Sequence, residues 1–319
     1  MSKKIYDVAI LGAGPAGLAA GIYTGRANLK TLIIEQGLDG GQIAQTSSLE
    51  NYPGQMPEGE SGTALIERFS KQAELFGAER AQDSVLEVDL ASNPKLIKGL
   101  MGEYQARSVI LATGASPRKG GFVNEDNFIG GGVSYCATCD GNFFRDSDVY
   151  VIGGGEAAVE EAMYLAKLAR KVTIIHRRDR LRAVESVQDR ARKVENLSVI
   201  YNSVVEEVNG DEILEEIKLR NVVNDEITTI KKNPADNLMG LFVFVGLNPN
   251  TGLYEGQVEL EAGYVLADED MKTNLDGVFA AGDLRKKNFR QVITAAADGA
   301  IAANSVRNYL ARLDGTEYV

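Results

Sequence analysis

Two cysteines stand three residues apart in the segment Cys136-Ala-Thr-Cys139-Asp140-Gly141, and the chain has no others. At this spacing two thiols can close a small disulfide ring, and neighbouring groups can lower the pKa of one thiol. Two cysteines and the single histidine of the chain make a poor zinc site, so no metal site is expected. Asp140 is placed to exchange protons with a thiolate, or alternatively to cap a helix. We therefore predict a redox couple at Cys136 and Cys139, with Asp140 as its acid/base.

A glycine-rich turn follows a short apolar run twice, at Tyr6–Gly17 and at Asp148–Ala158. Each copy predicts a strand, a tight turn and a helix whose N-terminal N–H groups bind a pyrophosphate. The contacting residues of the first copy would be Gly12, Gly14, Pro15, Ala16 and Gly17. Those of the second would be Gly153, Gly155, Glu156 and Ala157, with Ala158 as the third small residue. A single pattern of this kind also occurs in structural turns, but the repeat favours two dinucleotide-binding units.

The charge at the end of the next strand distinguishes the two nucleotides. Glu35 follows Gly12 by 23 residues, and His176 follows Gly153 by 23. A glutamate at this position accepts hydrogen bonds from ribose hydroxyls and repels a 2′-phosphate, so the first copy suits FAD or NAD.

The second copy instead ends in a basic loop, His176-Arg177-Arg178-Asp179-Arg180-Leu181-Arg182. Guanidinium groups bind phosphate oxygens in bidentate geometry, which suits NADPH. The alternatives are a solvated loop in which Asp179 pairs internally, and a histidine that only packs or caps. We assign His176, Arg177, Arg178 and Arg182 to NADPH.

Two further strand ends assign the first copy to FAD. The segment Arg107–Ala115 ends in Ala-Thr-Gly, at Thr113 and Gly114, and the segment Thr273–Asp283 ends in Gly-Asp. Asp283 could bind the ribityl hydroxyls of a flavin, and the helix after it could direct its positive end at the flavin ring. Each strand end could be structural when taken singly. Together with the cysteine pair they predict a relay of two electrons from nicotinamide to flavin to disulfide.

The elements that position these residues alternate between strand and helix. Strands are predicted at Ile5–Leu11, Lys30–Glu35, Ser108–Ala112, Asp148–Ile152, Lys171–Ile175, Leu241–Val245 and Val278–Ala281, and helices at Pro15–Gly25, Ala64–Phe76, Glu156–Leu168 and Val292–Leu310. This order predicts an α/β protein with parallel sheets covered on both faces, and 319 residues suggest two domains.

Composition limits the class of partner. The net charge of −11 argues against a nucleic-acid-binding surface, and no apolar run is long enough to span a bilayer. We therefore expect a cytoplasmic protein without nucleic-acid or membrane partners.

Over essentially its whole length the sequence resembles the bacterial low-molecular-weight thioredoxin reductases. The matching motifs, in order, are Gly12–Gly17, Gly40-Gly41-Gln42, Glu50-Asn51-Tyr52-Pro53-Gly54, Ala112-Thr113-Gly114, Cys136–Gly141, Gly153–Ala158, His176–Arg182 and Gly282-Asp283 with Arg290-Gln291-Val292. The resemblance implies two Rossmann-like dinucleotide-binding domains, the second inserted into the first. Residues 1–116 and 246–319 would form a discontinuous FAD domain, and residues 117–245 an NADPH domain with the dithiol. Hinge strands would lie near Ala115–Lys119 and Phe244–Gly246.

The resemblance also implies roles for individual residues. Additional FAD contacts would come from Gly41, Gln42, Asn51, Val85, Arg290, Gln291 and Val292, and Arg68 would face the protein partner. Cys139 would face the flavin, and Cys136 would attack the disulfide of thioredoxin or a thioredoxin-like protein. The inserted domain would rotate between two states, and the protein would be a homodimer.

Two positions depart from the family pattern. Gly131 replaces an arginine associated with partner docking, and Ala157 replaces a serine that donates to the NADPH pyrophosphate. The first departure leaves partner recognition open, and the second predicts weaker NADPH binding.

Other functions on the same fold stay open to different degrees. A hydroperoxide reductase flavoprotein would carry an extra N-terminal dithiol module, whereas this chain starts at its first strand. A dithiol oxidase or a ferredoxin-fed reductase would lack the arginine cluster. A flavin-bearing redox sensor would use the same cofactor and dithiol, and only turnover distinguishes it from the reductase.

Overall fold

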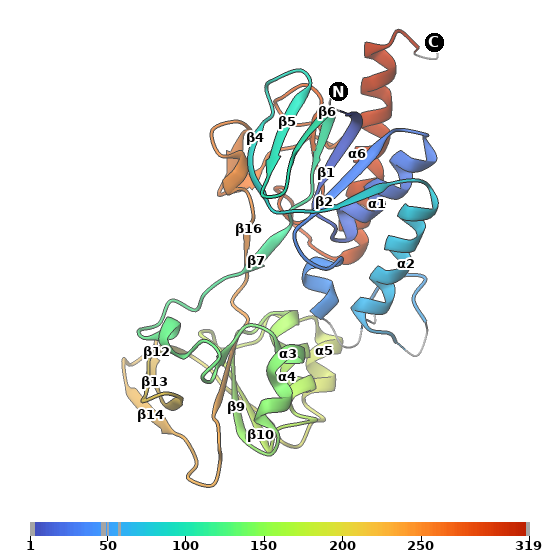
Figure 1. The fold of residues 1–319 in the computed structure, drawn as a ribbon. Helices are drawn as coiled ribbons and strands as arrows, with labels where there is room; N and C mark the ends of the chain where they lie inside the picture. Colours follow the sequence, from blue (N-terminus) through green and yellow to red (C-terminus); the bar gives the residue numbers. More distant parts are fainter. Residues whose placement is uncertain (1–3, 46–48, 50, 57–58, 317–319) are drawn as a thin grey trace. The chain divides into compact units, whose positions relative to one another are not determined.

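The computed structural model describes residues 4–45, 49, 51–56 and 59–316. The chain forms two compact units: unit 1 comprises Met1–Ser116 and Asn248–Val319, and unit 2 comprises Pro117–Leu247 (Figure 1). The second crossing between units lies two residues later than the sequence predicted. At the crossings, strands β7 (Ala115–Pro117) and β16 (Leu247–Pro249) pair with each other.

A mixed sheet forms the centre of unit 1. Its strands are β1 (Ile5–Leu11), β2 (Thr31–Glu35), β3 (Glu79–Gln82), β4 (Val85–Asp89), β5 (Lys95–Gly99), β6 (Glu103–Leu111) and β19 (Val278–Ala280). The order is β3-β2-β1-β6-β5-β4, with β19 paired to β6. Strands β3, β2, β1, β6 and β19 pair in parallel, whereas β5 is antiparallel to both β4 and β6. The expectation of wholly parallel sheets is therefore wrong here, because short loops join β4, β5 and β6 and only antiparallel strands accept such connections.

Helices cover one face of this sheet (Figure 1). They are α1 (Pro15–Arg26), α2 (Gly62–Leu75) and α6 (Val292–Leu313), with the short 3-10 turn η1 (Gly41–Gln45). The 3-10 turn η4 (Gly252–Tyr254) belongs to the other face. Helices α1 and α6 can pack closely because Gly299 has no side chain. A Cβ there would lie 2.1 Å from the carbonyl oxygen of Ala16. The other face packs on Val88, Tyr254 and Leu284, near the small ribbon β17 (Leu260–Glu261) and β18 (Tyr264–Val265).

Unit 2 has a five-stranded parallel sheet of order β11-β10-β9-β15-β8. The strands are β8 (Val133–Ser134), β9 (Asp148–Ile152), β10 (Lys171–Ile175), β11 (Leu197–Ile200) and β15 (Gly240–Val243). One face packs on α3 (Ala137–Asp140), α4 (Glu156–Leu165) and α5 (Glu185–Ala191), with the turn η3 (Gly141–Phe144). The turn η2 (Glu125–Phe128) belongs to the other face, where Phe128 is buried. The other face packs on an unpredicted antiparallel sheet of β12 (Ser203–Gly210), β13 (Leu214–Asn221) and β14 (Ile227–Lys231).

The predicted α/β class and the two Rossmann-like strand arrangements are confirmed. Helix α4 ends three residues earlier than predicted, at Leu165. The side-chain amide of Asn196 donates to the carbonyl oxygens of Ala166 (2.9 Å) and Ala169 (3.1 Å), which satisfies acceptors at this helix end.

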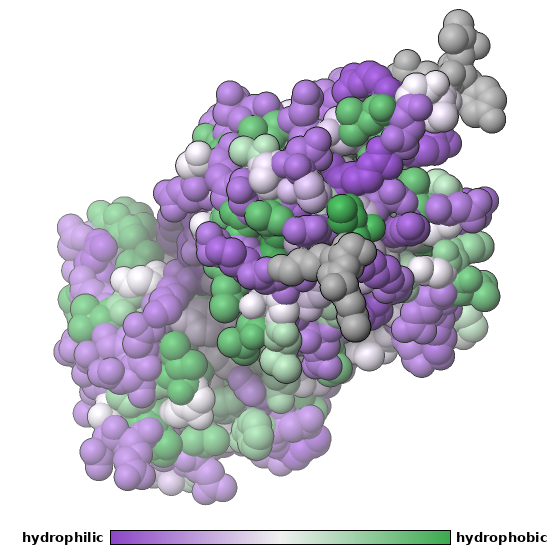
Figure 2. Space-filling model, turned by 45° about the horizontal axis from the view of Figure 1, so that its top comes forward, coloured by the Kyte–Doolittle hydropathy of each residue, from purple (hydrophilic) through white to green (hydrophobic). Residues whose placement is uncertain are grey.

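Within the described ranges, no helix has the length and apolar character needed to cross a bilayer. No group of three His, Cys, Asp or Glu side chains is arranged to bind a metal ion in the same part of the chain. Figure 2 shows hydrophilic side chains intermixed with smaller hydrophobic groups on the face that it presents.

Candidate functional site

The first glycine turn forms an open cradle at the N-terminus of α1. Gly12 has φ +108°, and a Cβ there would lie 2.4 Å from the carbonyl oxygen of Ala112. A Cβ on Gly17 would lie 1.9 Å from the carbonyl oxygen of Gly12, so helix and turn are in contact. Gly14 is the N-cap and supplies no side-chain cap, and Pro15 begins the helix. The N–H groups of this helix end therefore face a space that an anionic ligand can enter.

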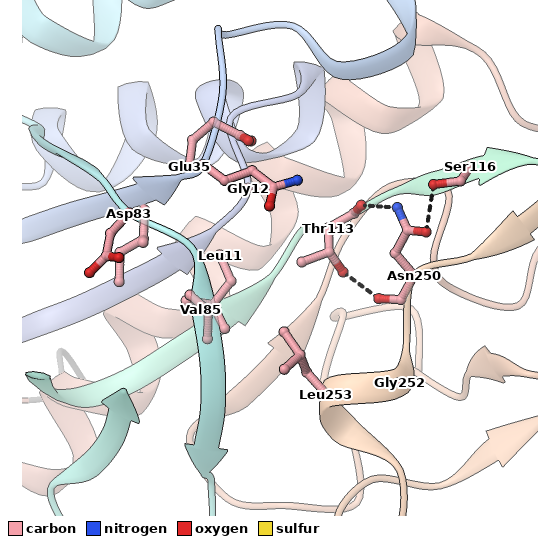
Figure 3. Close-up of a pocket in the computed structure, with 12 residues that line it drawn as sticks. Leu11, Gly12, Glu35, Asp83, Val85, Thr113, Ser116, Asn250, Gly252 and Leu253 are labelled. Atoms are coloured by element: carbon pink, nitrogen blue, oxygen red, sulfur yellow. Dashed lines mark hydrogen bonds between the residues drawn. The ribbon is translucent and has the colours of Figure 1, made fainter. Parts of the chain in front are cut away.

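Glu35 ends β2 beside this turn. Its Oε2 accepts a hydrogen bond from the N–H of Ala13 (2.9 Å), and its Oε1 accepts one from the N–H of Gly37 (3.1 Å). Glu35 lines a cavity of about 410 Å³ together with the predicted residues Gly12, Val85 and Thr113 (Figure 3). Five polar or small residues that the sequence did not reveal also line it: Gln36, Asp83, Ser116, Asn250 and Gly252.

Asn250 fixes the Ala-Thr-Gly end of β6. The hydroxyl of Thr113 donates to the carbonyl oxygen of Asn250 (2.7 Å), and the amide of Asn250 donates to the carbonyl oxygen of Thr113 (2.9 Å) (Figure 3). The hydroxyl of Ser116 donates to Asn250 Oδ1 (2.8 Å). In the sequence, Asn250 is marked only as a polar residue directly after Leu247–Pro249. Its partner Thr113 lies 137 residues away, so the sequence did not predict this contact.

Several of the predicted FAD residues that do not line this cavity contact one another or lie at the first turn. The amide of Asn51 donates to Gln291 Oε1 (3.1 Å), although 240 residues separate the two. The N–H of Gly40 donates to the carbonyl oxygen of Ala13 (2.8 Å), which brings Gly41 and the exposed Gln42 to the first turn. Glu50, which precedes Asn51 in the motif Glu50–Gly54, lies outside the described residues.

Asp283 presents an unsatisfied buried oxygen. Its Oδ1 has no hydrogen-bond partner among the described residues, and the Lys287 ammonium lies 3.6 Å away. Burial raises the pKa of Asp283. Asp298, buried on α6, accepts from the N–H of Gly282 (3.0 Å) and from Lys287 Nζ (2.9 Å), and so holds the turn from behind. An acidic residue within the small-residue stretch of α6 was the available sequence signal for Asp298.

The remaining predicted residues of unit 1 flank this turn. Arg290 Nε donates to the carbonyl oxygen of Asp283 (3.3 Å), and its guanidinium stacks 4.1 Å from the ring centroid of Tyr264. Val292 begins α6. Gly114 has φ +65° and open space where a Cβ would stand. An orphaned acidic oxygen, an uncapped helix end and glycine-lined space fit a bound dinucleotide with hydroxyl and phosphate groups.

Unit 2 repeats the cradle. Gly153 has φ +149°, and a Cβ there would lie 2.5 Å from Cβ of Ala158. Gly155 is the N-cap of α4, it has no side-chain cap, and nothing lies within 4 Å of the place where its Cβ would stand. Glu156 begins the helix, and Ala157 is exposed. This helix end also leaves room for a phosphate-bearing ligand.

His176 lies under the second turn. Its exposed fraction is 6%, and a Cβ on Gly154 would lie 2.3 Å from its Nδ1. Nε2 is buried without a hydrogen-bond partner among the described residues. Burial, and then the charge of Arg182, lower the pKa of this imidazole. Gly154 therefore matters for this packing, although the repeat pattern did not single it out.

The arginines of the basic loop are exposed. No ion pair joins Arg177, Arg178 or Arg182 to a carboxylate in the described part of the chain, Asp179 included. The backbone N–H of Arg182 donates to the carbonyl oxygen of Gly154 (2.6 Å), which fixes the loop to the glycine turn. Three free guanidinium groups beside an uncapped helix N-terminus suit a nucleotide with an additional phosphate.

The two cysteines form a disulfide, with an S–S distance of 2.06 Å. Cys136 is half-buried, and its Sγ accepts a hydrogen bond from the N–H of Cys139 (3.2 Å); Cys139 is exposed. Asp140 Oδ2 accepts from the hydroxyl of Ser134 (2.6 Å), and that hydroxyl accepts from the N–H of Cys136 (3.1 Å). Ser134 therefore connects the acid to the disulfide segment. The sequence signal was a hydroxyl two residues before Cys136.

The two positions that the family resemblance assigns to the partner surface, Arg68 and Gly131, have distinct surroundings. Arg68, on α2, forms a bidentate ion pair with Glu60 at 2.5 and 2.6 Å. A Cβ on Gly131 would lie 2.9 Å from the carbonyl oxygen of Glu212, in the β12–β13 turn. An arginine at position 131 would therefore require that turn to shift.

Comparisons with known proteins agree with this geometry. Residues 6–299 match the family model described as pyridine nucleotide-disulphide oxidoreductase. The chain is 52% identical over 309 residues to a thioredoxin reductase of Peptoclostridium acidaminophilum, with 97% of this chain and 98% of that protein covered. It is 43% identical to a thioredoxin reductase of Bacillus subtilis, with 98% of both chains covered. The crystal structure of Lactococcus lactis thioredoxin reductase superposes with a TM-score of 0.91 at 41% identity, covering 96% of this chain and 99% of that one. The chain belongs to the pyridine nucleotide-disulphide oxidoreductase family.

Proposed function

We propose that this oxidoreductase is an NADPH-dependent flavoprotein that reduces the disulfide of thioredoxin through Cys136 and Cys139. The observation that carries the proposal is the Cys136–Cys139 disulfide with an acid held beside it, in a chain with two dinucleotide cradles. The enzyme uses FAD and NADPH as cofactors. We assign FAD to unit 1 and NADPH to unit 2, on the basis of Glu35 at the first turn and the free arginines at the second.

The residues present suit both cofactors. In unit 1, the first turn of α1 would hold the pyrophosphate and Glu35 the ribose, while Asp283 offers its unpartnered oxygen to hydroxyl groups. In unit 2, the start of α4 would hold the second pyrophosphate, and Arg177 and Arg178 the 2′-phosphate. Bound FAD supplies the chemistry that no side chain has, accepting a hydride from NADPH and passing two electrons to a disulfide.

The cysteine segment completes the reaction. Two electrons and two protons convert the Cys136–Cys139 disulfide into two thiols, and Asp140 is the adjacent proton donor and acceptor. The N–H of Cys139 stabilises negative charge on Cys136 Sγ, which favours Cys136 as the thiolate that attacks the partner's disulfide. The mixed disulfide then breaks when Cys139 attacks Cys136. Thioredoxin leaves as a dithiol and the disulfide of the enzyme forms again.

Several expectations from the family resemblance belong to this proposal. They are a rotation of unit 2 about the crossings β7 and β16, a homodimeric assembly, and a cytoplasmic location. Docking of thioredoxin at Arg68 would require its guanidinium to exchange Glu60 for a group of the partner. Size-exclusion chromatography with light scattering would measure the oligomeric state, and a monomer would contradict it.

The test compares wild type with the Cys136→Ser variant. Wild type should oxidise NADPH steadily when thioredoxin is the acceptor. Cys136→Ser should lose thioredoxin turnover while NADPH still bleaches its flavin, because only the attack on the partner needs the Cys136 thiolate. Reduction by ferredoxin but not NADPH, or stoichiometric reduction without turnover on any redox protein, would contradict the proposal.

A further inference from the structure

Glu125 is a buried carboxylate that the proposed reaction does not use. It belongs to the turn η2, and 5% of its surface is exposed. Its Oε1 accepts from the N–H of Gly120 (2.7 Å) and from the hydroxyl of Tyr135 (2.5 Å), and its Oε2 accepts from the N–H of Gly121 (2.7 Å). No ion pair reaches Glu125 in the described part of the chain. Buried carboxylates are rarely held by neutral donors alone, so this arrangement calls for an explanation.

The three donors come from two segments with separate tasks. Gly120 and Gly121 follow the first crossing from unit 1. Gly120 lies three residues after Pro117, the last residue of β7. Tyr135 directly precedes Cys136. The chain between them, residues 122–134, is 13 residues long, and Glu125 bridges its two ends. The carboxylate thus joins the start of the inserted unit to the start of the redox segment.

The surroundings hold Glu125 in place. Phe122 and Phe128, on either side of it, are buried in the core of unit 2. Gly121 has φ +80°, which favours glycine, and a Cβ on Gly120 would lie 2.5 Å from the ring of Phe122. Burial, and then the hydrogen bond to Glu125, raise the pKa of Tyr135, so its hydroxyl remains a donor throughout the neutral range.

Glu125 is not placed for proton transfer. The hydroxyl of Ser134, and not Glu125, contacts the Asp140 carboxylate, and no hydrogen bond joins Glu125 to a cysteine among the described residues. Its contacts are two backbone N–H groups and one tyrosine. These contacts restrict the position of Tyr135 relative to Gly120 and Gly121 and carry no proton to the disulfide.

We infer that Glu125 is a positioning residue for the dithiol: by binding Tyr135 and Gly120–Gly121 together, it holds Cys136 at a fixed place relative to the chain that enters unit 2. This inference rests on the proposed function, in which electrons must reach the disulfide from a cofactor in the other unit. Electron transfer to the disulfide depends on where the two sulfur atoms lie, so it should depend on the Glu125–Tyr135 hydrogen bond. Hydride transfer from NADPH does not involve the sulfur atoms, so we expect its rate to be independent of that hydrogen bond.

The test uses the holoenzyme and two variants, Tyr135→Phe and Glu125→Gln. Tyr135→Phe removes one hydrogen bond and keeps the ring. Glu125→Gln keeps the volume but places an amide where a carboxylate accepted three bonds. Anaerobic stopped-flow with NADPH measures flavin bleaching, and quenching with an alkylating reagent counts the thiols formed. In Tyr135→Phe thiol formation should slow roughly tenfold, while the initial bleaching rate is unchanged and reduced flavin accumulates. Glu125→Gln should slow thiol formation at least as much.

Asp126→Asn is the matched control, because this neighbouring carboxylate is 66% exposed and its ion pair, with the surface Lys119, is the only one it forms among the described residues. It should leave both rates unchanged. Equal slowing of bleaching and thiol formation in Tyr135→Phe, an unchanged rate of thiol formation, or the same loss in Asp126→Asn would overturn the inference. Absence of thiol formation in wild type would instead refute the proposed function, and the role of Glu125 with it.

Discussion

Single residues set how tightly the second cradle can bind. Gly155 leaves the N-terminus of α4 without a side-chain cap, and the exposed Ala157 sits at the second position of that helix. The N–H groups of the first turn are the donors that remain for a phosphate. Binding here depends on the backbone of the turn and on the arginine loop hydrogen-bonded to it more than on side chains of α4 itself.

Adding a hydroxyl at this position should strengthen NADPH binding. Ala157→Ser supplies one donor in the first turn of α4, and such a hydrogen bond contributes about 0.5–1.5 kcal/mol. The dissociation constant for NADPH, measured by titration of the holoenzyme, should fall about two- to tenfold. Ala235→Ser, at an exposed position elsewhere in unit 2, serves as control and should have no effect. An unchanged constant in Ala157→Ser would show that the helix end does not contact the pyrophosphate.

At the scale of elements, strand β10 places the imidazole of His176 beneath the glycine turn. A close approach of this kind requires glycine at position 154. The turn, the strand end and the arginine loop thus form one packed group, since Arg182 also binds the carbonyl oxygen of Gly154.

This packing predicts a pH dependence of stability. Burial lowers the pKa of His176, so the unfolded chain, with a histidine pKa of about 6.5, binds a proton at higher pH than the folded protein does. The stabilisation is fully present above that value and is lost as the pH falls through the window down to the lowered pKa. His176→Asn should therefore flatten the fall in Tm below pH ~6.5 relative to wild type.

The chain has one histidine, so a proton NMR titration of the imidazole assigns the group directly. A midpoint at or above the ordinary histidine value would contradict the predicted burial effect.

At the scale of the whole molecule, the two units have separate cores, and the proposed function assigns FAD to unit 1 and NADPH to unit 2. A change confined to the arginine loop of unit 2 should therefore alter the use of NADPH without altering the FAD of unit 1.

The double variant Arg177→Ala, Arg178→Ala tests this division. Each charge-assisted hydrogen bond lost costs about 1.5–3 kcal/mol, so the KM for NADPH should rise at least tenfold. The KM for NADH and the FAD content should stay near the wild-type values, because neither involves a 2′-phosphate in unit 2. Equal increases for both nucleotides would show that these arginines do not read that phosphate.

Short local patterns in the sequence predicted many features of this protein. Some features can be predicted without knowledge of the fold, because each depends on residues within one short segment. They are the two glycine turns, the charged residues Glu35 and Arg177–Arg178 after the second strands, and the pair Cys136 and Cys139. The α/β class follows from the same local order. The antiparallel sheet β12–β14 did not follow, because its strands are polar and partly exposed and lack a continuous apolar run.

The sequence alone, then, determined the α/β class and predicted which groups do chemistry and which elements carry them. Tertiary structure decided which distant residues hold those groups in place: Asn250 on Thr113, Gln291 on Asn51, Asp298 behind Asp283, and Glu125 on Tyr135. The physical reason is that a buried polar atom must find a partner, and packing selects that partner from anywhere in the chain.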